Sequence, residues 1–140
     1  MPLPNHQLII ALNMTQATVV STSKAPAAIG PYSQAIKLGN LVFTSGQIGL
    51  NPATGELIGA GTEEQARQAF ANLKAVAEEA GGSLANVVKF TLFLTDLSEF
   101  AQVNAIMQEY VSAPFPARST VGVASLPKGA RFEVEAILAL

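Results

Sequence analysis

The chain has 140 residues, 49% of them hydrophobic and 13% charged, and this composition predicts one folded domain and excludes a disordered chain. It contains no cysteine, so disulfides, thiolate metal sites and cysteine nucleophiles are excluded. The net charge of −2, the scattered Lys and Arg residues and the lack of a long apolar run predict a cytoplasmic protein that binds neither nucleic acid nor membranes. The low fraction of charged residues has two explanations: the surface is rich in alanine, or part of it is buried against other subunits.

The N-terminal third predicts an extension followed by short strands. Residues 1–17 carry no formal charge and no sustained period, which predicts a flexible extension before a single domain over 18–140. A β-branched run at 18–22 predicts the first strand, and two prolines and a glycine in 25–32 predict an irregular segment. Gly39-Asn40 is a two-residue hairpin signal between strands at 35–38 and 41–45.

The clearest element is a helix that begins at Thr62. The run Thr62-Glu-Glu-Gln65 matches a capping box, apolar residues then recur at helical spacing to Ala80, and Gly81-Gly82 ends the helix. The Val-, Phe- and Leu-rich run at 87–95 predicts a mostly buried strand.

The C-terminal third predicts a second helix and two strands. Asp96 or Ser98 can cap this helix, and Pro114 and Pro116 stop it. Residues 118–124 and 131–138 alternate as strands do, and residues 125–129 are expected to join them as a hairpin.

This order of elements predicts an α+β fold, with one mixed sheet of about six strands and two helices on one face. The chain offers no third helix to cover the other face. We therefore expect another subunit to cover it.

Arg118 and two glutamates are the first candidates for chemistry. Arg118 opens a strand, and its planar fork can hold a carboxylate through two parallel hydrogen bonds, although a solvated strand-end arginine explains it too. Glu133 and Glu135 lie two apart on a strand and so share a face. If 118–124 and 131–138 form a hairpin, Arg118 and Thr120 lie on that face as well. The four side chains then form either a site or solvent-exposed cross-strand ion pairs.

Other candidates are equally open between structure and function. Ser45 and Gly46 are small residues at a strand end, which lets a ligand approach the backbone but also suits a turn. Asn104 lies near the apolar face of the second helix, as a packing hydrogen bond or a site residue. Tyr32 is ambiguous in the same way. No phosphate loop, dinucleotide fingerprint, serine elbow or metal-ligand cluster is present.

Together the motifs resemble the YjgF/RidA family. The resemblance runs from about Ser21 to the C-terminus. Its motifs are Ala25-Pro-Ala-Ala-Ile-Gly-Pro-Tyr-Ser-Gln34, Gly39-Asn-Leu-Val-Phe-Thr-Ser-Gly-Gln-Ile48, Asn51-Pro-Ala-Thr-Gly55, Gln65-Ala-Arg-Gln68, Phe100-Ala-Gln-Val-Asn104, Phe115-Pro-Ala-Arg-Ser119, Leu126-Pro-Lys128 and Glu133-Val-Glu-Ala136.

The resemblance implies a homotrimer of a chorismate-mutase-like α+β fold, with the sheets forming a central barrel and ligand clefts between subunits. It implies hydrolysis of reactive enamines and imines, such as 2-aminoacrylate, to 2-keto acids and ammonia, with no metal or organic cofactor. Arg118 would hold the substrate carboxylate, and Glu133 would position and deprotonate the attacking water. Tyr32, Ser45, Gly46, Asn104 and Thr120 would line the cleft. Arg118 near Glu133 would keep that glutamate ionised.

The chain departs from the family pattern in two places. Many deaminase members have cysteine where Thr120 stands, so cysteine-dependent chemistry is excluded. The segment from the second helix to Phe115 is a few residues short, so the rim of the cleft is expected to differ.

Two other functions suit the same residues. A non-catalytic trimer that binds 2-keto acids, or regulates and docks partner proteins, could use the same Arg118 clamp. A ribonuclease or translation inhibitor, a label some members carry, is disfavoured because basic residues do not cluster.

Overall fold

The computed structural model describes residues 17–140, so nearly all of the expected extension over 1–17 lies outside the described residues. The strands are β1 (Thr18–Val20), β2 (Ala35–Leu38), β3 (Leu41–Thr44), β4 (Gln47–Ile48), β5 (Val87–Leu94), β6 (Ala117–Gly122) and β7 (Phe132–Ala139). The α-helices are α2 (Thr62–Glu79) and α3 (Phe100–Met107), and the 3₁₀ turns are η1 (Leu84–Asn86), η2 (Leu97–Glu99) and η3 (Pro127–Gly129).

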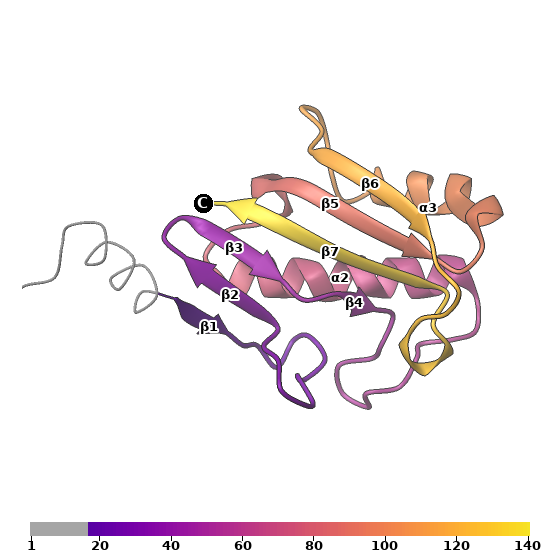
Figure 1. The fold of residues 1–140 in the computed structure, drawn as a ribbon, viewed down its shortest axis with the longest axis horizontal. Coiled ribbons are helices and arrows are strands. Elements are labelled where there is room, and N and C mark those ends of the chain that lie inside the picture. Colours follow the sequence, from indigo (N-terminus) through magenta and orange to yellow (C-terminus); the bar gives the residue numbers. More distant parts are fainter. Residues whose placement is uncertain (1–16) are drawn as a thin grey trace, which may run out of the picture.

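The strands form one mixed sheet in the order β1-β2-β3-β7-β5-β6, with short β4 pairing to β7 (Figure 1). Only β5 and β6 run parallel, and α3 lies in the connection between them. The other pairs are antiparallel, including the β2–β3 hairpin over Gly39-Asn40. The expected mixed α+β sheet is confirmed, and β4 is an addition to it.

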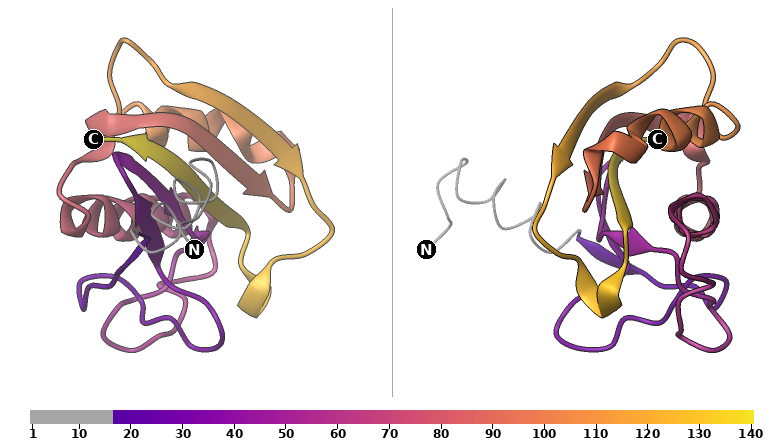
Figure 2. Two further views of the ribbon diagram at one scale, coloured as in Figure 1. Left: turned by 60° about the vertical axis from the view of Figure 1, so that its left-hand side comes forward. Right: turned by 90° about the vertical axis from the view of Figure 1, so that its right-hand side faces the viewer.

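Both helices pack on one face of the sheet (Figure 2), as expected. Phe70 of α2 is fully buried and contacts Phe90 of β5 and Phe132 of β7, at ring centroid distances of 6.1 and 5.6 Å. The apolar positions expected at helical spacing along α2 are buried. The core therefore lies between the helices and this face of the sheet.

The opposite face of the sheet has no covering layer within residues 17–140 (Figure 2). Along β7, residues alternate strictly between buried and half-exposed, and Glu133, Glu135 and Ile137 belong to the half-exposed set. Phe43 of β3 and Val121 of β6 are 42% and 40% exposed. We call this surface the open face.

The expected hairpin between the last two strands is wrong. β5 lies between them, pairing parallel with β6 and antiparallel with β7. From Phe90 onward β5 buries every second residue against the helices, which suits the centre of a sheet. The residues of β6 are mostly small or polar and are largely exposed, which suits an edge. Residues 123–131 pass the end of β5, where the Val123 amide donates to the Leu94 carbonyl at 2.9 Å.

Two helix ends differ from their expected positions. The N-cap of α2 is Gly61 rather than Thr62, and Glu64 accepts a hydrogen bond from the Gly61 amide at 2.9 Å. The second helix begins with a 3₁₀ turn capped by Asp96, and α3 ends at Met107, well before Pro114. Among residues 17–140, no helix is both long and apolar enough to cross a membrane.

Candidate functional site

Arg118 lies on the helix-facing side of β6. It is paired across the sheet with Phe90, which is paired in turn with Ala136. Its Nη1 donates to Oδ1 of Asn104 at 2.7 Å, and its guanidinium carbon lies 5.0 Å from the ring centroid of Phe100. Within residues 17–140 no carboxylate forms an ion pair with Arg118. The guanidinium is therefore oriented by α3 and available to an anionic ligand.

A cleft of about 330 Å³ opens beside this guanidinium. Its lining residues are Asn104, Met107, Gln108, Val111, Phe115, Pro116 and Arg118. One cation beside apolar side chains such as Met107, Val111 and Phe115 suits a small carboxylate with an apolar side chain. We call this cleft the Arg118 half-site.

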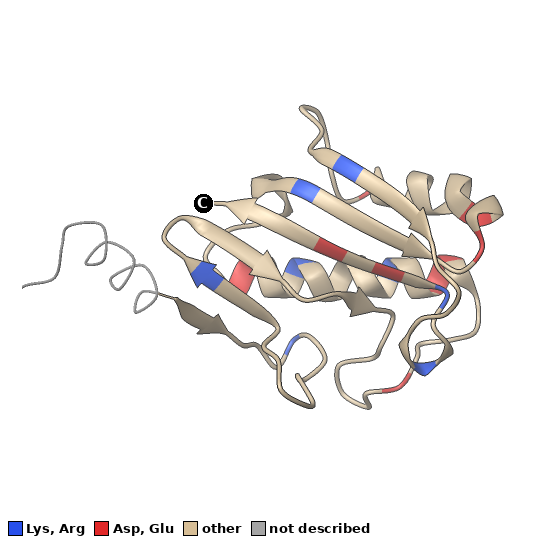
Figure 3. Cartoon of the chain, viewed as in Figure 1, with Lys and Arg blue, Asp and Glu red and all other residues tan. Residues whose placement is uncertain are grey.

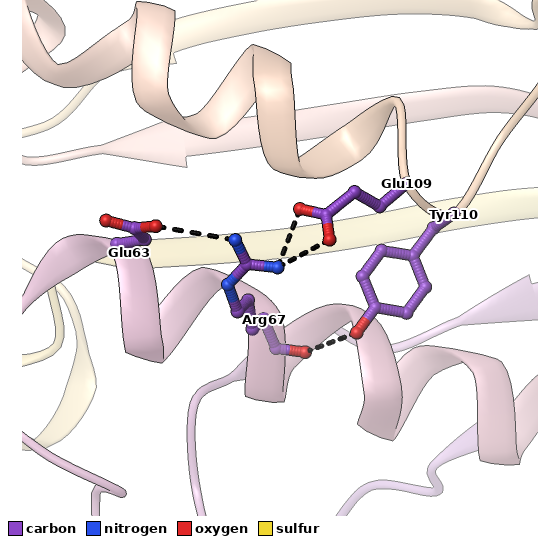
Figure 4. A network of polar contacts seen from close by, with 4 residues as sticks. All are labelled: Glu63, Arg67, Glu109 and Tyr110. Carbon is purple, nitrogen blue, oxygen red and sulfur yellow. Dashed lines mark hydrogen bonds and ion pairs between the residues drawn. The ribbon is translucent and has the colours of Figure 1, made fainter.

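A polar network fixes the turn that follows α3, which includes Gln108 of the cleft wall (Figure 4). Nη1 of Arg67 donates to both carboxylate oxygens of Glu109 at 2.6 Å, and Nη2 lies 3.4 Å from Glu63. The Tyr110 hydroxyl donates to the Arg67 carbonyl at 3.3 Å, and the Tyr110 ring stacks on Phe70 at 5.4 Å. The exposed ion pairs contribute little, so the aromatic stack supplies most of the attachment to α2.

Glu133 lies on the open face, where it is half-buried and paired with Ile48 of β4 and Phe93 of β5. Its carboxyl lies against Gly46, where a Cβ would come within 2.7 Å of the Glu133 Cδ and Oε2 atoms. A glycine at this position therefore makes room for the carboxyl group.

A second cavity, of about 700 Å³, surrounds Glu133. Its wall includes Tyr32, Ser45, Gly46 and Glu135, and we call it the Glu133 half-site. Neither Arg118 nor Asn104 belongs to it. In Figure 3 the acidic positions on β7 lie along the middle of the sheet.

The pKa of Glu133 is raised above its ordinary value, first by burial and second by the nearby charge of Glu135. A carboxylate with a raised pKa is a stronger base than an ordinary glutamate. The expectation that Arg118 keeps Glu133 ionised does not hold within one chain, because the two lie on opposite faces of the sheet.

The expected grouping of four side chains on one face is therefore wrong. Arg118 and Thr120 lie on the helix side with Phe90 and Leu92, whereas Glu133 and Glu135 lie on the open face. The error follows from the pairing of β6 with β5 rather than with β7. The alternation within each strand was predicted correctly, and only the relation between the strands was wrong.

The remaining predicted residues divide between the two half-sites. Asn104 belongs to the Arg118 half-site, and Tyr32, Ser45 and Gly46 belong to the Glu133 half-site. The Ser45 hydroxyl donates to the Ser33 carbonyl at 2.5 Å, so it can meet a ligand only as an acceptor.

Thr120 lines neither half-site. Its hydroxyl oxygen is buried, and it forms no hydrogen bond within the described part of the chain. Its expected role as part of the cleft wall thus has no support within one chain.

Three further residues contact Arg118 or line the Glu133 half-site. Phe100 and Met107 were not among the predicted site residues, yet both contact the Arg118 side chain. Their spacing of four and three residues from Asn104 places all three on one side of a helix, and this signal could have found them. Lys128 lines the Glu133 half-site and has a positive φ of 58°, which its sequence context does not reveal.

Within residues 17–140, no group of three or more His, Cys, Asp or Glu side chains could hold a metal ion. The fold and the two half-sites define an α+β protein with a cation-anchored cleft on one side of its sheet and a basic carboxylate on the other.

The family described as Endoribonuclease L-PSP matches residues 22–140. The chain is 47% identical, over 91% of its length and 99% of the relative's, to a 2-iminobutanoate/2-iminopropanoate deaminase of Dermatophagoides farinae. It is 46% identical to Reactive Intermediate Deaminase A, chloroplastic, of Arabidopsis thaliana, over 98% of this chain and 73% of that relative. The chain therefore belongs to this family, which is the YjgF/RidA family that its motifs resemble.

Solved structures agree with this assignment. RidA from an Antarctic Psychrobacter is 53% identical and superposes with a TM-score of 0.85, over 88% of this chain and 99% of that one. Escherichia coli TdcF with bound serine is 43% identical, with a TM-score of 0.83 over 88% of this chain and 98% of that one. One relative is named as a chloroplast protein, and the cytoplasmic location expected for this chain stays a prediction.

Proposed function

We propose that this protein is a cofactor-independent deaminase that hydrolyses reactive enamine and imine acids to 2-keto acids and ammonia. The observation that carries this proposal is the 47% identity, over 91% of the chain, to a 2-iminobutanoate/2-iminopropanoate deaminase. The oriented guanidinium of Arg118 and the basic carboxylate of Glu133 supply the two functions that such a reaction needs.

The proposed reaction begins with a bound 2-imino acid, formed when the enamine takes up a proton at carbon. Arg118 holds the substrate carboxylate through its guanidinium fork. Glu133 takes a proton from water while the water oxygen attacks the imine carbon, and the proton passes on to the nitrogen. The hydroxyl group of this adduct then passes its proton to the nitrogen as the C–N bond breaks and the C=O bond forms, leaving a 2-keto acid and ammonia. A positioned base contributes about 10²- to 10⁴-fold to such a rate.

We further propose that each active site is built from two copies of the chain. Arg118 and Glu133 lie on opposite faces of one sheet, so a small substrate cannot meet both within a single chain. Placing the Arg118 half-site of one copy against the Glu133 half-site of the next gives head-to-tail contacts, which close into a ring. The uncovered open face supports this arrangement, and a homotrimer is the ring that the family resemblance implies.

In this composite site, Asn104 orients Arg118 from one copy, while Tyr32, Ser45 and Gly46 surround Glu133 in the other. The substrate side chain would lie along the apolar wall formed by Met107 and Phe115.

The test generates 2-aminoacrylate in solution from serine with a dehydratase and follows the release of pyruvate. The wild type is expected to accelerate this release above the spontaneous rate, and Arg118→Ala is expected to lose the acceleration. Equal rates for the two proteins would exclude the proposal.

A non-catalytic 2-keto-acid-binding trimer that regulates or docks partners is the second candidate. The observation that favours it is the Arg118 guanidinium, which would hold a carboxylate whether or not turnover follows. Calorimetry that shows binding of a 2-keto acid, together with no acceleration of pyruvate release, would support this function instead.

Ribonuclease activity competes because the family description names it. Binding through the phosphate backbone requires clustered cations. The Lys and Arg positions of residues 17–140 are scattered over several elements and interspersed with acidic ones (Figure 3). We therefore expect no RNA cleavage in a gel assay with purified protein.

A further inference from the structure

The segment that carries Tyr32 into the Glu133 half-site has no helix or strand between Ser21 and Gln34. Tyr32 is 54% exposed and Ile29 is 82% exposed, so packing within the chain does little to hold the tip of this segment. An irregular, exposed segment samples many conformations unless other bonds fix it. Something else must therefore hold Tyr32 in place beside the cavity.

A single buried amide makes most of the attachments. Gln34 is 3% exposed, and its Oε1 accepts a hydrogen bond from the Thr22 amide at 2.7 Å. Its Nε2 lies within hydrogen-bond distance of three carbonyl oxygens, at 2.7 Å from Pro26, 3.0 Å from Thr22 and 3.4 Å from Ala25. The reversed orientation of the amide would face an oxygen toward three carbonyls, so only this orientation is compatible with its surroundings.

Hydrogen bonds to backbone carbonyls also join the Tyr32 segment to Ser45, which lies in the wall of the Glu133 half-site. The Gln34 carbonyl accepts a hydrogen bond from the Ser45 amide at 2.9 Å, and the Ser45 hydroxyl donates to the Ser33 carbonyl at 2.5 Å. Ser45 precedes Gly46, whose Cα lies against the Glu133 carboxyl group. One continuous set of bonds thus joins the Tyr32 segment to the residue that makes room for Glu133.

We infer that Gln34 is a positioning residue for the Glu133 half-site, holding Tyr32 and the Ser45–Gly46 wall in one arrangement around the carboxylate of Glu133. This inference rests on the proposed function. Gln34 acts through its neighbours, because its amide is already occupied by backbone groups of this chain.

The variants that test this role are Gln34→Met and Gln34→Glu. Methionine keeps the length of the side chain but removes both the donors and the acceptor. Glutamate keeps the acceptor for the Thr22 amide and removes the donors, so it serves as the second variant if methionine prevents folding. The control is Asn86→Ala, which removes a side-chain tie between Ser83 and Ala139 at the far end of β7.

The first readout is amide hydrogen exchange measured by NMR or mass spectrometry. In the Gln34 variants, exchange at Thr22 and Ser45 is expected to rise at least tenfold, while exchange at buried Val42 stays within about twofold of the wild type. Equal acceleration at all three positions would mean that Gln34 only stabilises the fold, and it would overturn the inference.

The second readout is the rate of pyruvate release from 2-aminoacrylate. Because a misplacement of about 1 Å can cost about a hundredfold, we expect kcat/KM to fall roughly ten- to a hundredfold in the Gln34 variants, and less than threefold in Asn86→Ala. In a Tyr32→Ala background, Gln34→Met is expected to cost less than in the wild type, because one of the two features that Gln34 positions is already gone. Additive losses, or equal losses in Asn86→Ala, would overturn the inference.

The same experiment separates the inference from the proposed function. A wild type that does not accelerate pyruvate release overturns both. An active wild type with fully active Gln34 variants overturns only the positioning role.

Discussion

The two half-sites are built in different ways. The Arg118 half-site depends on side chains, because α3 supplies both the amide that binds the guanidinium and the ring beneath it. The Glu133 half-site depends on the course of the backbone around the carboxyl group. Gly46 makes room for that group, and the buried Gln34 amide binds backbone atoms of the surrounding segment. The first supplies a fixed positive charge, and the second supplies a carboxylate whose pKa burial has raised.

Each half-site has what the other lacks. The cation has no carboxylate partner within residues 17–140, and the wall of the Glu133 half-site holds a lysine but no arginine. A charged group is left without a compensating partner only where solvent or a ligand supplies one. This complementarity favours a site that forms when two copies meet, and it can be tested directly.

The largest effect is expected from combining two inactive variants. Arg118→Ala removes the carboxylate anchor and Glu133→Gln removes the base, so each alone is expected to lose about 10²- to 10⁴-fold in kcat/KM. If every site takes Arg118 from one copy and Glu133 from another, random reassembly of an equal mixture gives about one quarter intact sites. The measurement is pyruvate release after the two variants are unfolded together and refolded.

Two controls accompany this mixture. Each variant is refolded alone, which should leave it inactive, and native mass spectrometry of the refolded mixture, with one variant mass-labelled, shows that subunits of the two variants assemble together. An equal mixture that regains no activity, despite demonstrated exchange, would exclude a site built from Arg118 of one copy and Glu133 of another.

A smaller effect is expected from Gly46→Ala, which tests the backbone-built half-site alone. The added methyl would come within 2.7 Å of the Glu133 carboxyl, which is the flexible end of a side chain and can move aside. We therefore expect the free energy of unfolding to change little, while kcat/KM falls about ten- to a hundredfold because the base is displaced.

Gly39→Ala provides the opposite control. Gly39 has a φ of +62° and no neighbour that a methyl would meet within 4 Å. Alanine there is expected to cost about 1 kcal/mol of stability through backbone strain and to leave kcat/KM unchanged. Gly46→Ala with unchanged activity would show that the Glu133 carboxyl tolerates displacement.

The contrast between the half-sites also explains which features the sequence could predict. The helix at 62–79, the hairpin over Gly39-Asn40 and the shared face of Glu133 and Glu135 follow from local periodicity and turn chemistry. The position of β6 does not follow from local patterns, because residues 123–131 could either turn back beside β6 or pass the end of β5. That choice depends on which strand buries more apolar surface, and it decided the face on which Arg118 lies.

Local sequence patterns did not predict the role of Gln34 either. Its partners lie 8 to 12 residues away in a segment without periodicity, so only the folded backbone brings them to one amide. Site residues that act through hydrogen bonds to irregular backbone have no spacing signature.

Thr120→Val should produce a modest effect on the Arg118 side of the sheet. The buried Thr120 hydroxyl has no hydrogen-bond partner within residues 17–140, and valine has the same shape without the polar atom. We expect the free energy of unfolding to rise by about 1 kcal/mol, since an unpaired buried hydroxyl costs about 1–3 kcal/mol. Because Thr120 lines neither half-site, kcat/KM should change less than about threefold.

Denaturant unfolding with steady-state kinetics measures both quantities. Thr120→Ser is the control, because it keeps the hydroxyl and loses the methyl group, so it should destabilise the fold. A gain in stability with a large loss of kcat/KM in Thr120→Val would instead assign the hydroxyl to substrate binding in the assembled site.

The smallest effect is expected from Glu135→Gln, through the pKa of Glu133. Burial is the first cause of that raised pKa and Glu135 the second, so the substitution lowers the pKa without restoring its ordinary value. Between the ordinary and the raised value the folded chain binds more protons than the unfolded chain, so Glu133 makes stability fall as the pH rises through this range.

Activity depends on the ionised base and is lost as the pH falls through the pKa of Glu133. The acidic limb of the kcat/KM profile should therefore move to lower pH in Glu135→Gln and stay in place in Glu79→Gln, which removes an exposed charge at the end of α2. A limb that does not move, or that moves to higher pH, would mean that Glu135 does not act on the base, and burial alone would then account for the basicity of this half-site.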